Sequence, residues 1–422
     1  MESRMRENCT YGLTRGRAYP ARGAPLYSTD MKIAFYTNII SPHTAPLVRA
    51  LACYTKDIVY IYNKRGGEPC RSEHALKGLE DQSLYLYDDQ HRAMQLLEDS
   101  ECLITGVRDL KLMGKRVANG KVTLYQSERW FKPISLTSML NPEQGGRHFW
   151  IEGFGKIYLP FAFRRASQIS ELFKSNKFLY LPIGVHAAGD MARLCGLMNG
   201  SLNCLFKAPR LDIDRTPCGE IHCPGDQNVS RYCLDRMRLW GYFVESFKRG
   251  TAVQDCTIHN PLRVLWVGRM LGWKRVDTLI KAIGGMKDIS LSVYGGGPEE
   301  IQLKRIVSSY DNITVGGMVA ISKVREIMRN HDVYVLTSNE FEGWGAVVNE
   351  ALEEGMEVVG TFEAGASATI LPRGNLFHAG DWRGLRRLLL SKHEKSARIG
   401  EWSVDSAARK LLELMEDLSN AK

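Results

Sequence analysis

Several features that would mark a secreted, membrane-spanning or nucleic-acid-binding protein are missing from this sequence. No uninterrupted apolar run reaches the ~18 residues that a membrane-spanning helix needs, and the N-terminus carries no apolar signal region. The ten cysteines follow no repeating spacing, so we expect reduced thiols in a cytoplasmic protein. No recognition helix or interleaved aromatic segment for reading bases is present, and nucleic acid is therefore not an expected partner.

Familiar catalytic and metal-binding motifs are missing as well. The chain has no Walker-type loop, no Gly-x-Gly-x-x-Gly with a well-placed acidic partner, no Gly-x-Ser-x-Gly and no His-Glu-x-x-His. Cys218, His222 and Cys223 resemble half of a zinc site, but no second pair follows at suitable spacing. Asp212 and Asp214 could bind a metal–nucleotide, although they lie in a loop-like stretch. We therefore expect no metal and no cofactor.

What is present fits a soluble globular protein of about two domains. A chain of 422 residues exceeds the roughly 100–200 residues of a single domain. An apolar fraction of 44% and a charged fraction of 24% suit sizeable cores. The formal charge of +9 suggests anionic partners such as nucleotide phosphates or acidic lipid headgroups, or simply a soluble surface.

Strands and helices alternate along both halves of the chain, which predicts βαβ units, parallel sheets and an α/β fold class. The first strand is predicted at 32–37, and the pattern restarts with a strand at 263–267. We expect five successive parts: a disordered extension at 1–30, a first domain at 31–247, a linker at 248–260, a second domain at 261–395, and a C-terminal helix within 396–422 that packs back toward the first domain.

The stretch from Ser338 to Gly360 is the most informative part of the chain. An apolar strand at 333–336 runs into a polar turn with Glu342-Gly343-Trp344-Gly345, and a helical pattern containing Glu350 follows. The glycines allow a ligand to approach the backbone, and the N–H groups of a helix start favour an anion. A carboxylate on either side suits hydroxyl groups. The stretch therefore predicts a site for a phosphate next to a polyol.

Cations and further glycines follow other strands of the same half. Arg269 comes directly after the strand at 263–267, and Lys274 lies five residues further on at a helix start. Two cations at such a place suit a diphosphate better than a single carboxylate. The turn Gly295-Gly296-Gly297 also follows a strand and permits close approach of a ligand. Open α/β sheets bind ligands at these strand ends.

Taken together, Gly268-Arg269…Lys274, Gly295-Gly296-Gly297-Pro298, Gly316 and Glu342-Gly343-Trp344-Gly345…Glu350 resemble the retaining GT-B glycosyltransferases of family 4. The resemblance covers about Arg263 to Leu412. More loosely, the first half resembles a bacterial subgroup that builds surface polysaccharides, through the segments 38–43, 127–132 and 240–243. The resemblance implies GT-B architecture, with two Rossmann-like domains facing a central cleft.

The resemblance also implies roles on the donor side. Arg269 and Lys274 would hold the donor diphosphate and stabilise the leaving nucleoside diphosphate, which removes the need for a metal. Glu342 would contact hydroxyls of the donor sugar, and Glu350 would accept hydrogen bonds from the ribose. The other donor-binding residues would offer backbone N–H groups or lie beside the base: Gly268, Gly296, Gly297, Met318, Gly343, Trp344 and Gly345. Transfer would retain the anomeric configuration, and the departing phosphate would take the acceptor proton.

The acceptor side carries three candidates, His43, Glu128 and His186, each of which also fits a strand-end polar residue that caps a helix. The first loop differs from many relatives, because Ser41-Pro42-His43 stands where they have paired glycines against the diphosphate.

Two further positions depart from the family's pattern. Arg275 replaces the usual Gly after the Lys, and Glu357 replaces the usual Pro.

The implied function is sugar transfer from a nucleotide-diphosphate sugar to a saccharide or lipid-linked acceptor, by a hexosyltransferase-like enzyme of cell-surface polysaccharide or glycan synthesis. Two alternatives are a sugar-nucleotide epimerase of the same fold and a non-catalytic nucleotide-sugar-binding subunit. The segment 154–175 mixes aromatic and basic residues, which fits a helix on an anionic membrane surface or a core-packing helix with a basic edge. We therefore expect a cytoplasmic protein, peripheral on the inner face of the membrane.

Overall fold

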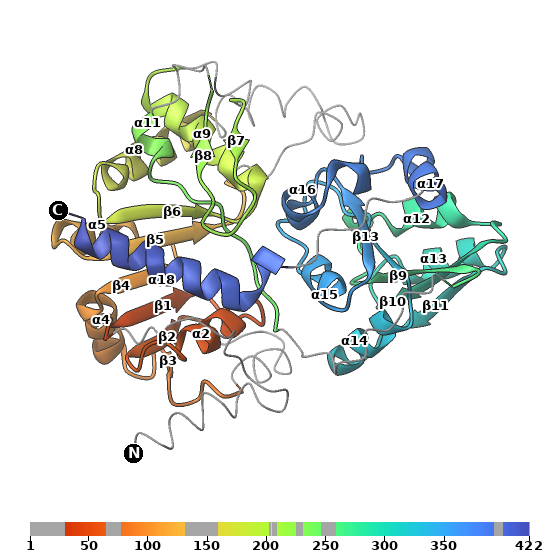
Figure 1. The fold of residues 1–422 in the computed structure, drawn as a ribbon, viewed down its shortest axis with the longest axis horizontal. Helices are drawn as coiled ribbons and strands as arrows, with labels where there is room; N and C mark the ends of the chain where they lie inside the picture. The colour runs from red at the N-terminus through yellow and green to blue at the C-terminus, as the bar shows by residue number, and fades with distance from the viewer. Residues whose placement is uncertain are drawn as a thin grey trace. The chain divides into compact units, whose positions relative to one another are not determined.

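The computed structural model divides the chain into two compact units, and each is described by itself (Figure 1). Unit 1 runs to Glu245 and takes up the chain again at Val404, whereas unit 2 is the part between them. The residues that the structure describes are 30–64, 77–130, 159–201, 204, 209–224, 231–245, 259–391 and 400–421.

Unit 1 is built on a parallel six-stranded sheet with the strand order β3-β2-β1-β4-β5-β6. Strands β1 and β4 at its centre are buried along their whole length. They read as continuous apolar runs because helices cover both faces of such a sheet. The strands are β1 (Ile33–Thr37), β2 (Ile58–Tyr62), β3 (Ser83–Tyr85), β4 (Cys102–Thr105), β5 (Val122–Ser127) and β6 (Phe178–Pro182).

The helices of unit 1 are α2 (Ala45–Leu51), α4 (Gln90–Asp99), α5 (Leu110–Ala118), α8 (Leu159–Phe173), α9 (Val185–Met198), α11 (Arg231–Leu234) and α18 (Val404–Asn420). Two of them begin at a capping carboxylate. Asp89 accepts the backbone N–H of Arg92 and Asp109 that of Leu112, both at 2.9 Å. The last helix, α18, packs against α2, near the other end of the chain (Figure 1).

A short antiparallel pair, β7 (Asp212–Ile213) and β8 (Ile221–His222), completes unit 1. The basic-aromatic segment expected at 154–175 corresponds to α8 from Leu159 onward, and Ile169 and Phe173 of this helix are buried in unit 1. Its first residues lie outside the described part of the chain, as do nearly all of the N-terminal extension at 1–30 and the linker at 248–260 as far as residue 258.

Unit 2 repeats the same design, with a parallel sheet in the order β11-β10-β9-β12-β13-β14. The strands are β9 (Leu262–Val267), β10 (Ile289–Tyr294), β11 (Ile313–Gly317), β12 (Val333–Leu336), β13 (Glu357–Thr361) and β14 (Leu376–Phe377). The helices are α12 (Val276–Ile283), α13 (Glu300–Val307), α14 (Ile321–Arg329), α15 (Val347–Glu353), α16 (Gly365–Ile370) and α17 (Trp382–Leu390), with short 3₁₀ turns η3 (Gly272–Lys274), η4 (Arg373–Asn375) and η5 (Gly400–Trp402).

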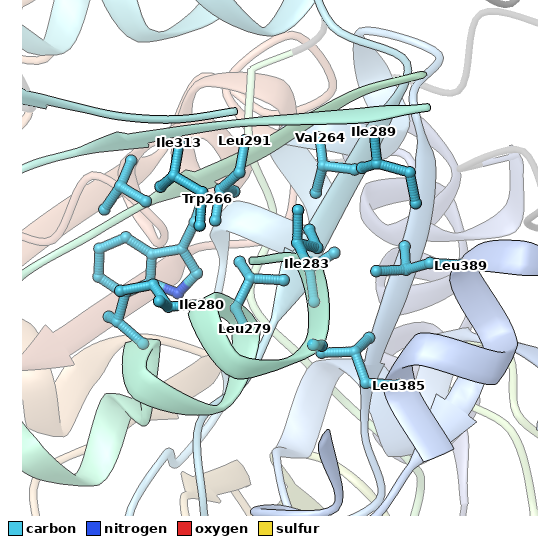
Figure 2. Close-up of a cluster of buried hydrophobic side chains, with 14 of the residues drawn as sticks. Val264, Trp266, Leu279, Ile280, Ile283, Ile289, Leu291, Ile313, Leu385 and Leu389 are labelled. Carbon is cyan, nitrogen blue, oxygen red and sulfur yellow. The ribbon is translucent and has the colours of Figure 1, made fainter. Parts of the chain in front are cut away.

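The core of unit 2 lies between its sheet and the pair α12 and α17. Figure 2 shows Trp266 and Leu291 of the sheet close to the apolar face of α12, with α17 beside it. Apolar residues recur every three or four positions along α12, so one stripe of the helix is buried. The side chains of this core include Val264, Trp266, Leu279, Ile280, Ile283, Ile289, Leu291, Leu385 and Leu389.

Counted within its own unit, each sheet has the strand order 3-2-1-4-5-6 of a doubly wound α/β fold. The α/β class with two Rossmann-like units is thereby confirmed. In this fold, ligands bind beyond the carboxyl ends of the strands, at the point where the order reverses. That point lies between β1 and β4 in unit 1 and between β9 and β12 in unit 2. Within the described residues, no helix is both long and apolar enough to cross a lipid bilayer.

Candidate functional site

The loops after β9 and β12 meet at the order reversal of unit 2. Their two strands pair in parallel, and the loops that follow are joined by two hydrogen bonds. The hydroxyl of Thr337 donates to the Lys274 carbonyl at 2.6 Å, and the backbone N–H of Asn339 donates to the Trp273 carbonyl at 3.0 Å. These bonds hold the two loops in one fixed arrangement, so residues that are distant in the sequence can form a single site.

The centre of this site is an ion pair between the ammonium of Lys274 and the Oε2 atom of Glu342. Both side chains are shielded, with 16% and 11% of their surface exposed. The buried hydroxyl of Ser338 donates to the same carboxylate oxygen at 2.8 Å. A shielded charge is tolerated when it is paired and hydrogen-bonded. The structure thus brings together a cation and a carboxylate that stand 68 positions apart.

The second predicted cation is placed differently. Arg269 lies on the same loop as Lys274 but is exposed, and no ion pair within the described residues involves it. Lys274 also lies over the ring of Trp273, with the ammonium 4.5 Å from the ring centroid. The site therefore contains one shielded cation and one exposed cation.

Arg275 departs from the glycine expected after the lysine, and its backbone explains why glycine is favoured there. The residue has φ 52° and ψ 42°, in the left-handed region, at the point where η3 passes into α12. A residue with a Cβ adopts this conformation at an energetic cost that glycine avoids. The Arg275 side chain turns to Asp277, with Nε 3.2 Å from Oδ1.

The turn Gly343-Trp344-Gly345 packs directly against the start of α16. Gly345 has φ +92°, and a methyl group added to Gly365 would overlap the carbonyl oxygen of Gly343. The indole N–H of Trp344 donates to Asn349 Oδ1 at 2.9 Å, and the residue is 2% exposed. Trp344 is consequently a core side chain, and only its backbone is available to a ligand.

Glu350 lies half-buried on α15. Like Glu342, it lies near Tyr334 of β12. Burial raises the pKa of the Tyr334 phenol well above its usual range, and the carboxylates of Glu342 and Glu350 both add to the rise in pKa. The two acidic residues therefore lie near one buried phenol. Tyr334 is a site neighbour that sequence reasoning missed, because a tyrosine inside an apolar strand resembles any other core residue.

The glycine turn after β10 packs on the loop after β9. The Gly268 N–H donates to the Tyr294 carbonyl at 3.0 Å, and the Met270 N–H to the Gly296 carbonyl at 2.9 Å. A Cβ at Gly297 would clash with the backbone of Met270. Glycine at position 297 is therefore needed for the two backbones to pack so closely.

Met318 is the other donor-side candidate in this region. Its side chain reaches toward Gly296, where an added Cβ would lie 3.0 Å from the Met318 Cγ atom. The side chain is 85% exposed and thus offers an apolar surface beside the turn.

The acceptor-side candidates lie in unit 1, and the structure brings two of them together. The rings of His43 and Tyr242 stack with centroids 5.8 Å apart, and the Tyr242 hydroxyl donates to Glu128 Oε1 at 3.0 Å. Burial raises the pKa of Tyr242 well above its usual range, and Glu128 adds to this. His186 lies apart from them, at the start of α9, where it lines a separate cavity.

Sequence reasoning did not name Tyr242 as a site residue, although it connects two candidates. Its position in the run Trp240-Gly241-Tyr242-Phe243 was the available signal. Within the described residues, no group of three or more His, Cys, Asp and Glu side chains gathers as a metal site. Asp214, from the Asp-x-Asp pair, instead accepts hydrogen bonds from the N–H and the hydroxyl of Thr216.

Comparison with known proteins finds a similarity in the C-terminal part of the chain. Residues 261–391, which contain the whole Lys274–Glu342 site, match the family model described as glycosyl transferases group 1. The structure of Anabaena Alr3699/HepE in complex with UDP is similar, with a TM-score of 0.57 and 14% identity, over 92% of this chain and 100% of that one. The fold is GT-B.

A second similar structure is the lipopolysaccharide outer core galactosyltransferase WaaB in its apo form, with a TM-score of 0.56 and 13% identity, covering 92% of this chain and 99% of that chain. A glycosyltransferase from Rickettsia africae ESF-5 has a TM-score of 0.55 and 12% identity, covering 93% and 100%. At these identities, the likeness concerns the fold alone.

Curated relatives match over shorter stretches. The GtfA subunit of a UDP-N-acetylglucosamine–peptide N-acetylglucosaminyltransferase from Streptococcus pneumoniae is 27% identical over 108 residues, which are 24% of this chain and 21% of that protein. The uncharacterized glycosyltransferase MJ1069 of Methanocaldococcus jannaschii is 29% identical over 119 residues, 26% of this chain and 30% of that protein. The chain thus spans less than a third of each relative. The group 1 domain and the fold support a GT-B glycosyltransferase.

Proposed function

We propose that this protein is a retaining glycosyltransferase of family 4 type, which moves a sugar from a nucleotide-diphosphate sugar to a saccharide or lipid-linked acceptor in cell-surface polysaccharide or glycan synthesis. The observation that carries the proposal is the shielded pair of Lys274 and Glu342 at the order reversal of unit 2. The group 1 match spans this pair. A nucleotide-sugar donor is further supported by the similar fold of a protein whose structure contains UDP and glucose.

Lys274 supplies positive charge for the donor diphosphate, and Arg269 adds a second charge from the exposed part of the same loop. When the bond between the sugar and the diphosphate breaks, negative charge develops on the leaving phosphate. Fixed cations that face developing charge stabilise the transition state, and this is usually the largest single contribution to catalysis. In this proposal the cations do the work of a metal ion, and the reaction needs none.

Glu342 accepts hydrogen bonds from hydroxyls of the donor sugar. Its pairing with Lys274 and the bond from Ser338 hold the carboxylate in one orientation, which is what a positioning group requires. Glu350 accepts hydrogen bonds from the ribose. Gly343 and Gly345 offer backbone N–H groups beside them, since neither residue has a side chain in the way.

Met318 lies beside the nucleobase in this proposal. The exposed thioether is polarizable and suits contact with a flat aromatic ring. Gly296 lies close to the Met318 side chain. Gly297 follows on the same turn, and Gly268 lies on the loop after β9 that packs against this turn. These residues determine the shape of the base-binding end of the site.

The transfer step needs no base from the protein. The acceptor oxygen attacks the anomeric carbon on the face from which the diphosphate departs, the carbon–oxygen bond to phosphate breaks, and the acceptor proton passes to the departing phosphate. The product therefore keeps the configuration of the donor sugar. On the acceptor side, the stacked His43 and Tyr242 and the carboxylate of Glu128 contact the acceptor.

We further propose that the protein acts in the cytoplasm, peripherally on the inner face of the membrane. The net charge of +9 supports attraction to anionic lipid. Flotation with vesicles of neutral and of anionic lipid tests this, and equal binding to the two kinds of vesicle would contradict it.

The function is tested by calorimetric titration of the protein with UDP- and GDP-sugars, followed by product analysis. We expect one donor to bind the wild type and Glu342→Gln to weaken that binding. In contrast, Glu326→Gln, which changes an exposed carboxylate on α14, should leave binding unchanged. Transfer to an acceptor with retained configuration, read by NMR, supports the proposal. A donor altered without any acceptor identifies an epimerase, and binding without turnover over a broad acceptor panel identifies a binding subunit.

A further inference from the structure

Unit 1 contains a cavity of about 230 Å³ that lies apart from the stacked His43 and Tyr242. One wall is a single face of α9. It is formed by Val185 and by the residues one, four, five and eight positions after it. The other walls come from the loop after β5 and from the segment before β8. The cavity is lined by Arg129, Val185, His186, Gly189, Asp190, Arg193, Pro209, Leu211 and Ile213.

The lining of this cavity carries more positive than negative charge. Arg129 and Arg193 contribute two guanidinium groups, and Asp190 is the one carboxylate among the lining residues. Asp190 is 3% exposed and lies 3.5 Å from the Nε atom of Arg129, so these two groups compensate each other. Among the described residues that line the cavity, Arg193 has no carboxylate left to compensate its charge.

Arg193 also has an unused donor. Its Nε atom is buried and has no hydrogen-bond partner in the described part of the chain. Buried donors in proteins almost always have a hydrogen-bond acceptor, because a donor shielded from bulk water is costly to leave without one. An arginine that lines a cavity with such a donor fits a site whose acceptor arrives with a ligand. Guanidinium groups bind carboxylates and phosphates through two parallel hydrogen bonds.

The cavity is also in the right part of the sheet for a ligand. Strands β5 and β6 pair along their length, Arg129 lies just beyond the carboxyl end of β5, and α9 begins just beyond that of β6. Ligands of open α/β sheets bind beyond the carboxyl ends of strands. Gly189 widens the cavity, since nothing lies within 4 Å of where its Cβ would be. A volume of about 230 Å³ is below the ~300–1,000 Å³ of pockets that enclose whole ligands, so it suits one charged group of a larger molecule.

We propose that this cavity binds the oxyanion of an acidic acceptor, a carboxylate or a phosphate, and that Arg193 is its main ligand. The inference rests on the proposed function, because the acceptor is the second substrate of that reaction. His186 and Arg129 line the same cavity and contribute further donors. The site selects acceptors that carry a negative charge over neutral saccharides of the same size.

The test is calorimetric titration of the full chain, without donor, with glucuronate, inorganic phosphate and glucose. Phosphate is titrated into Lys274→Met, so that the diphosphate site of unit 2 does not contribute. We expect glucuronate or phosphate to bind at least about tenfold more tightly than glucose, and Arg193→Gln to weaken that binding about tenfold or more, as for the loss of a charge-assisted hydrogen bond. Arg92→Gln, an exposed arginine on α4, is the matched control and should bind like the wild type.

Binding of glucuronate identifies a carboxylate-bearing acceptor, and binding of phosphate alone identifies a phosphate-bearing one. Equal affinity for glucose, or affinity unchanged in Arg193→Gln, overturns the proposal. If Arg193→Gln does not fold, Asp190→Asn gives the opposite readout, since loss of the compensating carboxylate should tighten anion binding severalfold. The donor site is scored separately by titration with the nucleotide sugar. Anion binding without any nucleotide-sugar binding would refute the proposed function and leave the oxyanion site standing.

Discussion

The two sheets of this protein have the same strand order, yet the loops at their order reversals are built from different residues. In unit 2, glycines with positive φ, such as Gly295 and Gly345, let backbones pack closely around a shielded cation and carboxylate. In unit 1, the first loop carries His43 and runs into α2 with a proline in its first turn. The fold decides where a ligand can bind, and the loop residues decide which chemistry is offered there.

The charges of the two units also differ in how they are compensated. The cation and the carboxylate of unit 2 form one pair with a supporting hydroxyl from Ser338. In unit 1, the cavity on α9 has one arginine more than its carboxylate can balance. In the pair of unit 2, Glu342 can orient a neutral sugar while Lys274 faces the diphosphate. In unit 1, an arginine without a balancing carboxylate suits an incoming anion.

The largest expected effect comes from breaking the pair of unit 2. Lys274→Met removes the cation that faces the diphosphate and should lower turnover about 100-fold or more. It should also weaken donor binding. Steady-state kinetics with the identified donor measures this, and Lys281→Met, which removes an exposed lysine of α12, is the control. If both variants lose activity equally, Lys274 has no special role at this site.

The second largest expected effect is on the free energy of unfolding, because the space around glycine residues differs between the two units. Gly365→Ala places a methyl group against the Gly343 carbonyl and should lower the free energy of unfolding by about 1–3 kcal/mol, as overpacking does. Gly114→Ala lies inside α5 with open space around its Cβ, and it should raise the same free energy by about 0.5–1 kcal/mol. Urea unfolding of both variants measures the two changes, and changes of the same sign would contradict the comparison.

A smaller effect is expected from the aromatic cluster of unit 1. Tyr242→Phe keeps the ring that stacks on His43 but removes the hydroxyl that donates to Glu128. Turnover should fall about tenfold, as for the loss of a hydrogen bond to a charged group, while donor affinity stays the same. Kinetics at saturating donor, with Tyr54→Phe as a half-buried control in the same unit, separate these quantities. A loss of donor affinity would show that Tyr242 contributes to donor binding, and it would contradict the proposed role of Tyr242 on the acceptor side.

The smallest expected effect is on the pH dependence of stability. Burial holds the pKa of His331, between α14 and β12, below its ordinary value of 6.5, and its bond to the Ile327 carbonyl opposes this only in part. The unfolded chain therefore takes up the proton first as the pH falls. The stabilisation is complete above about pH 6.5 and declines as the pH falls from there through the lower folded pKa.

Urea unfolding between pH 7 and pH 5 measures this decline. His331→Gln should flatten the acid side of the profile, whereas His91→Gln, at an exposed position on α4 in unit 1, should leave it as in the wild type. An unchanged profile in His331→Gln would show that other groups control the acid side.

Much of the fold follows from the sequence, because buried parallel strands leave a local pattern. The apolar runs of β1, β9 and β12 and the helical periodicity of α12 are visible without any tertiary information. The loops that carry Lys274 and Glu342 could be located for the same reason, since they directly follow such strands. Strand order is not local, and the reversal point where these loops meet appears only once the sheet is assembled.

By itself, then, the sequence determined the α/β class, the strand ends and the residue types gathered there. Tertiary structure decided which of those residues meet: Lys274 with Glu342, and His43 with Glu128 through Tyr242, while His186 faces another cavity. It also placed Tyr334 near two carboxylates and left the Nε atom of Arg193 without an acceptor in the part of the chain that the structure describes. The physical reason is that local pattern specifies each strand and helix, whereas pairing across a sheet depends on packing between segments far apart in the chain.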